Sequence, residues 1–206
     1  AMRITNKTLM PAESVHEDVV DASGSYVIEV PEGARYEGVF LLKGETLKIA
    51  VHLTGKNAGC VLKIAYLSST DLKNDIVCDV YHDAPETYSS QIVKGVLAEN
   101  GTADYHGVIH IPFNSQKCEG SQNHHAVLLS DEAKVTCVPE LEIYADDVKC
   151  AHGSAIGALD EMQLFYLQSR GIDLKEAQKM LIHGFLSDLL PEAFEPQITE
   201  WMVKHA

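Results

Sequence analysis

Apolar and polar residues alternate in short runs along most of the chain. Such alternation places one side of a β-strand in a core and the other toward solvent. Gly, Asn, Asp or Pro residues separate the runs, as expected of turns. The pattern predicts strands over residues 25–30, 38–42, 46–54, 60–67, 76–81, 90–98, 103–111, 125–129, 134–138, 141–145 and 148–152. Many short strands predict a sandwich, a barrel or a β-solenoid, and no fixed short repeat decides among them.

The spacing of apolar residues becomes helical near the C-terminus. A first helix is predicted over 159–169, where Arg170-Gly171 forms a basic last turn and a stop. A second begins at Asp173, which forms a capping-box pattern with Glu176, and a third covers 196–204. We expect a β region over 1–153 and a helical region over 154–206. The stripe predicted on the second helix consists of Ala177, Met180, Leu181, Gly184 and Phe185.

The charge, the apolar runs and the number of cysteines indicate which binding partners and which cellular compartment to expect. The formal charge of -14 disfavours binding to nucleic acid phosphates and to anionic membrane surfaces. No apolar run is long enough for a membrane helix, and the first residues do not resemble a signal peptide. An odd number of cysteines, five, favours a reducing cytoplasm over a disulfide framework.

Cys150 and His152 carry the most suggestive chemistry. On a strand both project from the same face, roughly 7 Å apart at Cα. A thiolate and an imidazole suit zinc, ferrous iron or an iron-sulfur cluster. Two ligands do not complete a tetrahedral site, however, and a buried cysteine with a hydrogen-bonded histidine is commoner on spacing alone.

Two other function classes are left open by these residues. His106 and His110 share a strand face, so a metal-dependent, cupin-like β-barrel enzyme could combine some of His106, His110, His124, His125 and His152. A purely structural interaction module is the other class. The chain has no phosphate-binding G-x-x-x-x-G-K-[ST] loop, G-x-S-x-G elbow or H-E-x-x-H helix, so we expect it to bind no nucleotide and to lack hydrolase activity.

The amino-acid sequence of one long segment resembles that of a known protein family. The run LLSDEAKVTCVPELEIYADDVKCAHGSAIGALDEMQLFYLQSRGI closely resembles the C-terminal signature of the SufB/SufD family of iron-sulfur cluster assembly scaffolds, nearer to the SufD type. The upstream run KGVLAENGTADYHGVIHIP is similar to the preceding part of that family. Since the chain is about half the family's usual length, it resembles a short form. The resemblance implies a mainly β fold, a right-handed parallel β-helix core followed by a small α-helical region, with the first eighty residues matching least.

The resemblance also implies roles for particular residues. Cys150 and His152 match the K-C-x-H-G positions of SufD-type proteins, which lie near the interface with SufB, and the histidine is implicated in cluster assembly. His125 stands near a position that is cysteine in SufB-type proteins, which argues against a SufB-like persulfide relay and leaves it as a weaker iron ligand. Cys137 is a further weak candidate if stacking of strands brings it close to Cys150.

In this family the helical end binds SufC, an ABC-type ATPase. The resemblance therefore implies a non-enzymatic, cytoplasmic scaffold that carries an iron-sulfur cluster transiently and binds a SufC-like ATPase. It would pair with a SufB-like subunit or with a second copy of itself. The candidate partner-binding side chains are Met162, Phe165, Tyr166, Met180, Leu181 and Phe185.

Overall fold

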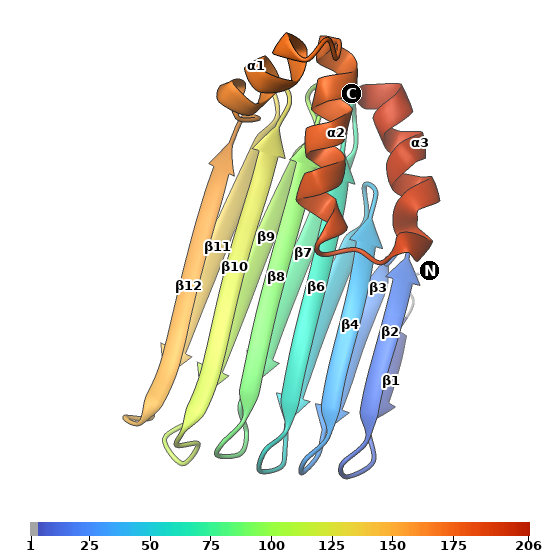
Figure 1. The fold of residues 1–206 in the computed structure, drawn as a ribbon. Coiled ribbons are helices and arrows are strands. Elements are labelled where there is room, and N and C mark those ends of the chain that lie inside the picture. Colours follow the sequence, from blue (N-terminus) through green and yellow to red (C-terminus); the bar gives the residue numbers. More distant parts are fainter. Residues whose placement is uncertain (1–3) are drawn as a thin grey trace.

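Two parallel β-sheets face each other in the computed structural model, which describes residues 4–206 (Figure 1). Sheet A has the strand order β1-β3-β5-β7-β9-β11, and sheet B has the order β12-β10-β8-β6-β4-β2. The chain thus alternates between the sheets, and each strand pairs in parallel with the strand two positions later. This winding is a flattened parallel β-helix, so the predicted mainly β class and the β-helix core are confirmed.

Each turn of the β-helix contains one strand from each sheet. The strands of sheet A are β1 (Ile4–Thr8), β3 (Gly24–Val30), β5 (Thr46–Leu53), β7 (Lys73–Tyr81), β9 (Thr102–Ile111) and β11 (Lys134–Ile143). The strands of sheet B are β2 (Ser14–Val20), β4 (Arg35–Leu42), β6 (Gly59–Ser68), β8 (Tyr88–Leu97), β10 (Cys118–Leu128) and β12 (Val148–Gly157). Residues 4–81 therefore form the first turns of the same β-helix.

The turns lengthen along the chain. Ile4 pairs with Ser25, 21 residues later, whereas Thr102 pairs with Lys134, 32 residues later. The added residues lengthen the strands and the corners between them. A β-helix with turns of unequal length has no fixed sequence period, which explains why periodicity did not reveal it.

Corners between strands are tight and use left-handed backbone conformations. Gly33 and Gly44 have positive φ angles, but so do several residues with side chains. An L-residue in this conformation costs roughly 1 kcal/mol, which the flanking ladder hydrogen bonds must offset. These corners therefore lack the usual glycine signal; the non-glycine residues are Ala12, Asp21, Asn57, Asp71, Glu86, Glu99 and Lys117.

Parallel register stacks the inward-facing side chains in columns. One column in sheet B runs Phe40, Ile64, Val93, His124 and Ser154, and the next runs Gly38, Leu62, Gln91, Gln122 and His152. Each column is apolar in the early turns and polar in the last ones. The apolar part forms the main core, in which side chains such as Phe40 and Ile64 are fully buried.

Hydrogen bonds connect the buried polar side chains of the later turns. Tyr105 Oη donates to Gln91 Oε1 (3.1 Å), and Gln122 Nε2 donates to Gln91 Oε1 (3.0 Å) and to Tyr105 Oη (3.1 Å). Tyr66 Oη lies 2.9 Å from His124 Nε2, and Tyr105 stacks on the His124 ring. This network satisfies most of the polar atoms that the β-helix buries, as the cost of an unpaired group requires.

A second buried histidine lies in the same later turns. His82, in the corner after β7, contacts Thr87 Oγ1 (2.7 Å) and Ser89 Oγ (2.8 Å). Burial lowers the pKa of His82 and the pKa of His124 to about 4 each. Both imidazoles are therefore neutral in the folded protein near neutral pH.

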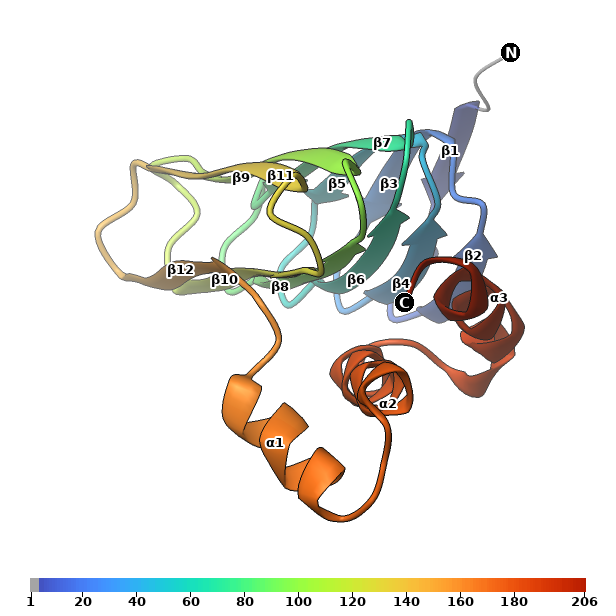
Figure 2. The same cartoon turned by 90° about the horizontal axis from the view of Figure 1, so that it is seen from above.

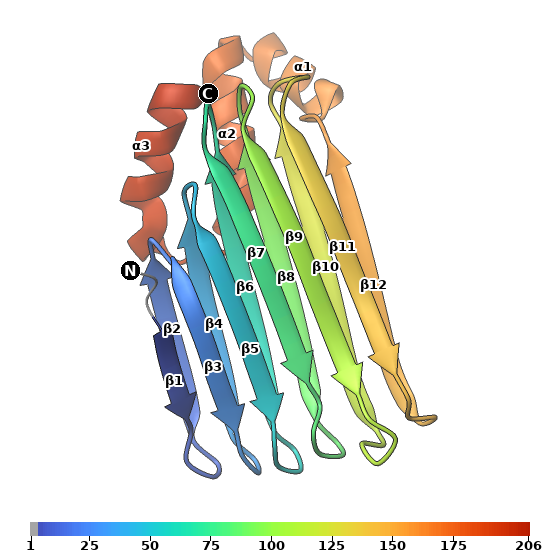
Figure 3. The ribbon, with the colours of Figure 1, turned by 180° about the vertical axis from the view of Figure 1, so that it is seen from behind.

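The helices lie on the side of sheet B and leave the outer face of sheet A uncovered (Figures 2 and 3). They are α1 (Glu161–Ser169), α2 (Leu174–Ser187), the 3-10 turn η1 (Glu192–Phe194) and α3 (Glu195–His205). The second hydrophobic cluster joins outward-facing Val39, Leu41 and Leu67 of sheet B to Ile182, Leu186 and Trp201 of the helices. None of the helices in residues 4–206 is long and apolar enough to cross a membrane.

The predicted stripe on α2 does not match the face that the structure buries. Ala177, Ile182 and Leu186 are buried, whereas Met180 is 45 % exposed and Leu181 and Phe185 are half-buried. The helix carries apolar residues on more than one face, so spacing alone does not decide which face packs on sheet B. The cap is as predicted, since the Asp173 side chain accepts a hydrogen bond from the Glu176 backbone N–H (3.1 Å).

Gly95 offers a test of interior packing. A Cβ atom at Gly95 would lie 2.0 Å from Cζ of Tyr66, so Gly95→Ala must displace the ring that contacts His124. We expect a loss of about 1–3 kcal/mol in the free energy of unfolding, the usual cost of overpacking. Gly157→Ala is the matched control, because no atom lies within 4 Å of its Cβ position. Equal stabilities of the two variants in urea unfolding would contradict this packing.

Buried neutral histidines predict a pH dependence of stability. The unfolded chain binds a proton with an ordinary histidine pKa of 6.5, whereas folded His82 does so only near 4. The contribution of each buried histidine to the free energy of unfolding should therefore be fully present above pH 6.5 and should be lost as the pH drops toward 4. The loss should be roughly 2 kcal/mol per buried histidine between pH 7.5 and 5. Urea unfolding should show about half this decrease in His82→Asn, where only His124 remains. An undiminished decrease in that variant would assign the effect to other groups.

Candidate functional site

The last turn of the β-helix, formed by β11 and β12, presents the chemistry predicted from the sequence. Within residues 4–206, β11 and β12 are the last strands of their sheets, at one end of the β-helix (Figure 1). The inward-facing side chains of these two strands therefore lie at the open end of the core. Cys150 pairs in register with Gly120 and His152 with Gln122. Cys150 and His152 thus lie two residues apart on the inner face of β12, as the sequence predicts.

Cys150 lies over a glycine of the preceding turn. A Cβ atom at Gly120 would lie 3.4 Å from Sγ of Cys150, so the thiol projects over this residue. Cys150 packs at the edge of a small apolar cluster that includes Ile109 and Cys118. Burial raises the pKa of the thiol, and a backbone contact from Gly120 opposes this shift. The thiol therefore favours its protonated form, and a metal would have to displace that proton in order to bind.

His152 is the accessible member of the pair. Its side chain is exposed, and no hydrogen bond or ion pair joins it to the rest of residues 4–206. An imidazole of this kind can present either ring nitrogen to a ligand. Cys150 and His152 together supply one sulfur and one nitrogen donor at the end of the β-helix.

Cys137 lies in the same turn but not beside Cys150. It is on β11, where it contacts Ser154, which opposes the rise in its pKa caused by burial. Ser154 lies four residues from Cys150 along β12, a separation of roughly 13 Å by strand rise. Stacking therefore brings Cys137 into the last turn without bringing the two thiols together.

His124 and His125 point to opposite sides of β10. His125 is exposed on the outer face of sheet B, away from Cys150, whereas His124 is fully buried in the interior. The predicted strand, 125–129, began too late to include the alternation from Cys118 that assigns these sides. Gln122, also fully buried, is the residue that sequence reasoning missed, although it neighbours His152 directly.

The histidines that a cupin-like metal site would need do not lie close together in the structure. His106 and His110 lie on the outer face of sheet A, where they pair with Glu140 (3.3 Å) and Glu142 (2.9 Å). His124 is inside the core and His125 is on the outer face of the other sheet. Within residues 4–206, no three His, Cys, Asp or Glu side chains are arranged to hold a metal ion. Cys150 and His152 thus supply at most two of the four ligands of a tetrahedral metal site.

The helices expose a separate apolar surface. Met162, Phe165 and Tyr166 of α1 are 73 %, 65 % and 57 % exposed, and α1 buries none of its own residues. An apolar hollow of about 310 Å³ lies beside them, lined by Met162, Gln163, Tyr166, Leu167 and Leu181. Phe185 is engaged elsewhere, because Lys94 Nζ lies 4.8 Å above its ring.

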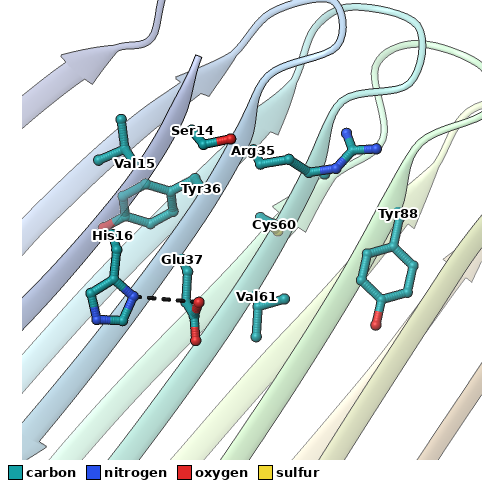
Figure 4. A pocket seen from close by; sticks show the side chains of 10 residues that line it. Ser14, Val15, His16, Arg35, Tyr36, Glu37, Cys60, Val61 and Tyr88 are labelled. Carbon is teal, nitrogen blue, oxygen red and sulfur yellow. Dashed lines mark ion pairs between the residues drawn. The ribbon is translucent and has the colours of Figure 1, made fainter. Parts of the chain in front are cut away.

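A hollow of about 450 Å³ on the sheet B side is remote from these residues (Figure 4). His16 and Glu37 form an ion pair across it (3.3 Å), and Lys63 also pairs with Glu37 (2.7 Å). Arg35 donates to backbone carbonyl groups of Ala34 and Asn57. Its charged groups are therefore already engaged, and none of the residues predicted from the sequence lines it.

Comparison with known proteins agrees with this geometry. Residues 22–185 match the model of the family described as SUF system FeS cluster assembly, SufBD core domain. The chain is 37 % identical over 156 residues to the iron-sulfur cluster assembly protein SufD of Escherichia coli, covering 73 % of this chain and 36 % of that protein. It is 36 % identical over 132 residues to the chloroplastic protein ABCI7 of Arabidopsis thaliana, covering 64 % of this chain and 28 % of that protein.

A SufBD family protein of Synechocystis is 31 % identical over 134 residues, covering 63 % of this chain and 30 % of that protein. The chain thus spans about a third of the length of these relatives, less than the half expected from the resemblance. The match includes β3 to β12, α1 and most of α2, with Cys150 and His152 inside it. The chain therefore belongs to the SufBD family of the SUF iron-sulfur cluster assembly system.

Proposed function

We propose that the chain is a SufD-like scaffold subunit of a Suf-type complex and that a nascent iron-sulfur cluster is its cargo. The observation that carries this proposal is the pair Cys150 and His152, which share the inner face of β12 at the open end of the β-helix. Thiolate and imidazole are both established ligands of iron-sulfur centres. The proposed role is binding and orientation of the cargo, without catalysis by this chain.

A partner must supply the remaining ligands, since no third suitable side chain within residues 4–206 joins the pair. The open end is the natural place for that partner. β11 and β12 each have an unpaired edge, and apolar side chains near them are exposed, among them Val138 (40 %), Tyr144 (61 %) and Ile156 (42 %). Such edges and side chains favour association. We propose a SufB-like subunit or a second copy of this chain as that partner.

We also propose that a SufC-like ABC ATPase binds the surface formed by α1 and the adjoining part of α2. The exposed Met162, Phe165 and Tyr166, with the hollow beside Leu181, form an anchor of the kind that partner helices use. Energy would come from ATP bound to that partner, because this chain lacks a phosphate-binding loop.

The proposed location is the cytoplasm. All five cysteines are free, as expected for a reducing compartment in which thiols remain available to metals.

The cluster site is tested by anaerobic supply of iron and sulfide to the complex, followed by visible absorption. The wild-type chain should acquire the broad charge-transfer absorption of a cluster, and Cys150→Ala or His152→Ala should lose most of it. Cys137→Ala is the matched control, because this thiol lies in the same turn but contacts Ser154, which is about 13 Å along β12 from Cys150. A Cys150→Ala, His152→Ala double variant with undiminished cluster would instead indicate a purely structural subunit.

Binding of the ATPase is tested by changing one exposed side chain. Phe165→Glu should weaken binding of a SufC-type ATPase by about 10-fold or more, since an exposed aromatic side chain that the partner would bury becomes a charge. Val203→Glu on α3 is the matched control, because Val203 is 68 % exposed and lies outside the proposed surface. Titration calorimetry of both variants, with circular dichroism to confirm folding, decides the result. Equal binding by both variants would exclude this surface.

A further inference from the structure

One acceptor atom beneath the open end has no partner. Gln122 is fully buried, yet its Oε1 has no hydrogen bond in the described part of the chain. A buried carbonyl without a partner is costly and uncommon in folded proteins. Such an atom therefore points to a group that it binds in the working state of the protein.

The orientation of the Gln122 amide is fixed by its other branch. Nε2 donates to Gln91 Oε1 and to Tyr105 Oη, both contributed by earlier turns. A flipped amide would set two carbonyl oxygens, of Gln122 and Gln91, against each other at 3.0 Å. Nε2 must therefore stay where it is, and Oε1, on the other branch of the planar amide, is left free of that network.

The packing around the amide supports this arrangement. A Cβ atom at Gly107 would lie 2.1 Å from Gln122 Nε2 and 2.3 Å from Tyr105 Oη, so the glycine leaves the space that the pair occupies. Gln91, Gln122 and Tyr105 are thus held together in a defined position beneath the last turn.

His152 is the neighbour of Gln122 in the last turn. The two residues pair in register on adjacent parallel strands and lie on the same inner face. The His152 side chain is exposed and makes no hydrogen bond within residues 4–206, so its ring can turn toward the amide. Its Cα lies one strand spacing, about 4.8 Å, from that of Gln122.

We propose that Gln122 is a positioning residue for His152. Oε1 accepts the N–H of one ring nitrogen, which leaves the lone pair of the other nitrogen directed to the cargo at the open end. Histidines that bind metals commonly donate their second N–H to a carbonyl or carboxylate in this way, which fixes the tautomer. The positioning role rests on the proposed function, because it requires that His152 binds the cargo. The hydrogen bond between Gln122 and His152 does not depend on that function.

The test compares Gln122→Leu with Tyr105→Phe in protein labelled with ¹⁵N at histidine. Both variants lose the hydrogen bond between Gln122 Nε2 and Tyr105 Oη, but in Tyr105→Phe the amide of Gln122 is still held by Gln91 Oε1, and only Gln122→Leu removes the acceptor beside His152. The ¹⁵N shifts of the His152 ring should report one dominant neutral tautomer in the wild type and in Tyr105→Phe, and a mixture in Gln122→Leu. Identical shifts in the wild type and Gln122→Leu, or equal changes in both variants, would overturn the proposal.

Cluster retention separates this inference from the proposed function. With iron and sulfide supplied anaerobically to the complex, Gln122→Leu should retain the cluster about 10-fold less well, as is usual when the hydrogen-bond partner of a ligand is lost. Tyr105→Phe should retain it normally. If the tautomer responds as expected but not even the wild type acquires a cluster, the hydrogen bond is supported and the proposed function fails. Unchanged retention in Gln122→Leu, with a cluster present in the wild type, would overturn the positioning role.

Discussion

Parallel pairing between successive turns is the constraint on which the rest of the molecule depends. Because every strand takes its register from the strand one turn earlier, each inward side chain lies above a defined neighbour. The environment of one turn is therefore set by the side chains of the previous one. One column changes from apolar to polar along the β-helix, in the order Leu62, Gln91, Gln122 and His152. The neighbour of His152 in the preceding turn is therefore an amide, whereas Leu62 occupies the same position two turns earlier. The interior becomes polar where the core opens.

The helices are attached to the outside of the same turns, which ties the two proposed binding surfaces together. Ile182, Leu186 and Trp201 are buried against the outer face of sheet B, so α2 and α3 cannot move independently of it without exposing this cluster. α1 is different, because it buries none of its residues and follows β12 after a short link, Ala158 to Asp160. A partner bound to α1 would pull on the strand that carries Cys150 and His152. In the proposed complex, a movement of the ATPase bound to α1 would be transmitted through this short link to the strand that binds the cargo.

Alternation of apolar residues was sufficient to predict most strands, and helical spacing was sufficient to predict all three α-helices. The solenoid followed only from family resemblance, because the turns differ in length and corners such as Asn57 and Glu99 replace glycine by strained L-residues. The site was predictable in part. Cys150 and His152 share a face by simple parity, whereas Gln122 was overlooked because β10 buries Gly120, Gln122 and His124 in place of apolar residues. A strand whose inner face is polar has no hydrophobic alternation to detect.

The chemistry of Cys150 argues for a cargo held in passing. Burial raises the pKa of this thiol, so forming the thiolate ligand requires loss of a proton that the site itself retains. His152, by contrast, is exposed to solvent and would bind through a lone pair without burial of a charge. In the proposed complex, two such donors, one reluctant to ionise and one open to water, would hold a metal weakly until a partner encloses the end of the β-helix and adds its own ligands. Enclosure would strengthen the attraction between thiolate and iron by excluding water, and separation would weaken it. Retention of the cargo then depends on assembly, which suits a scaffold that must release what it carries.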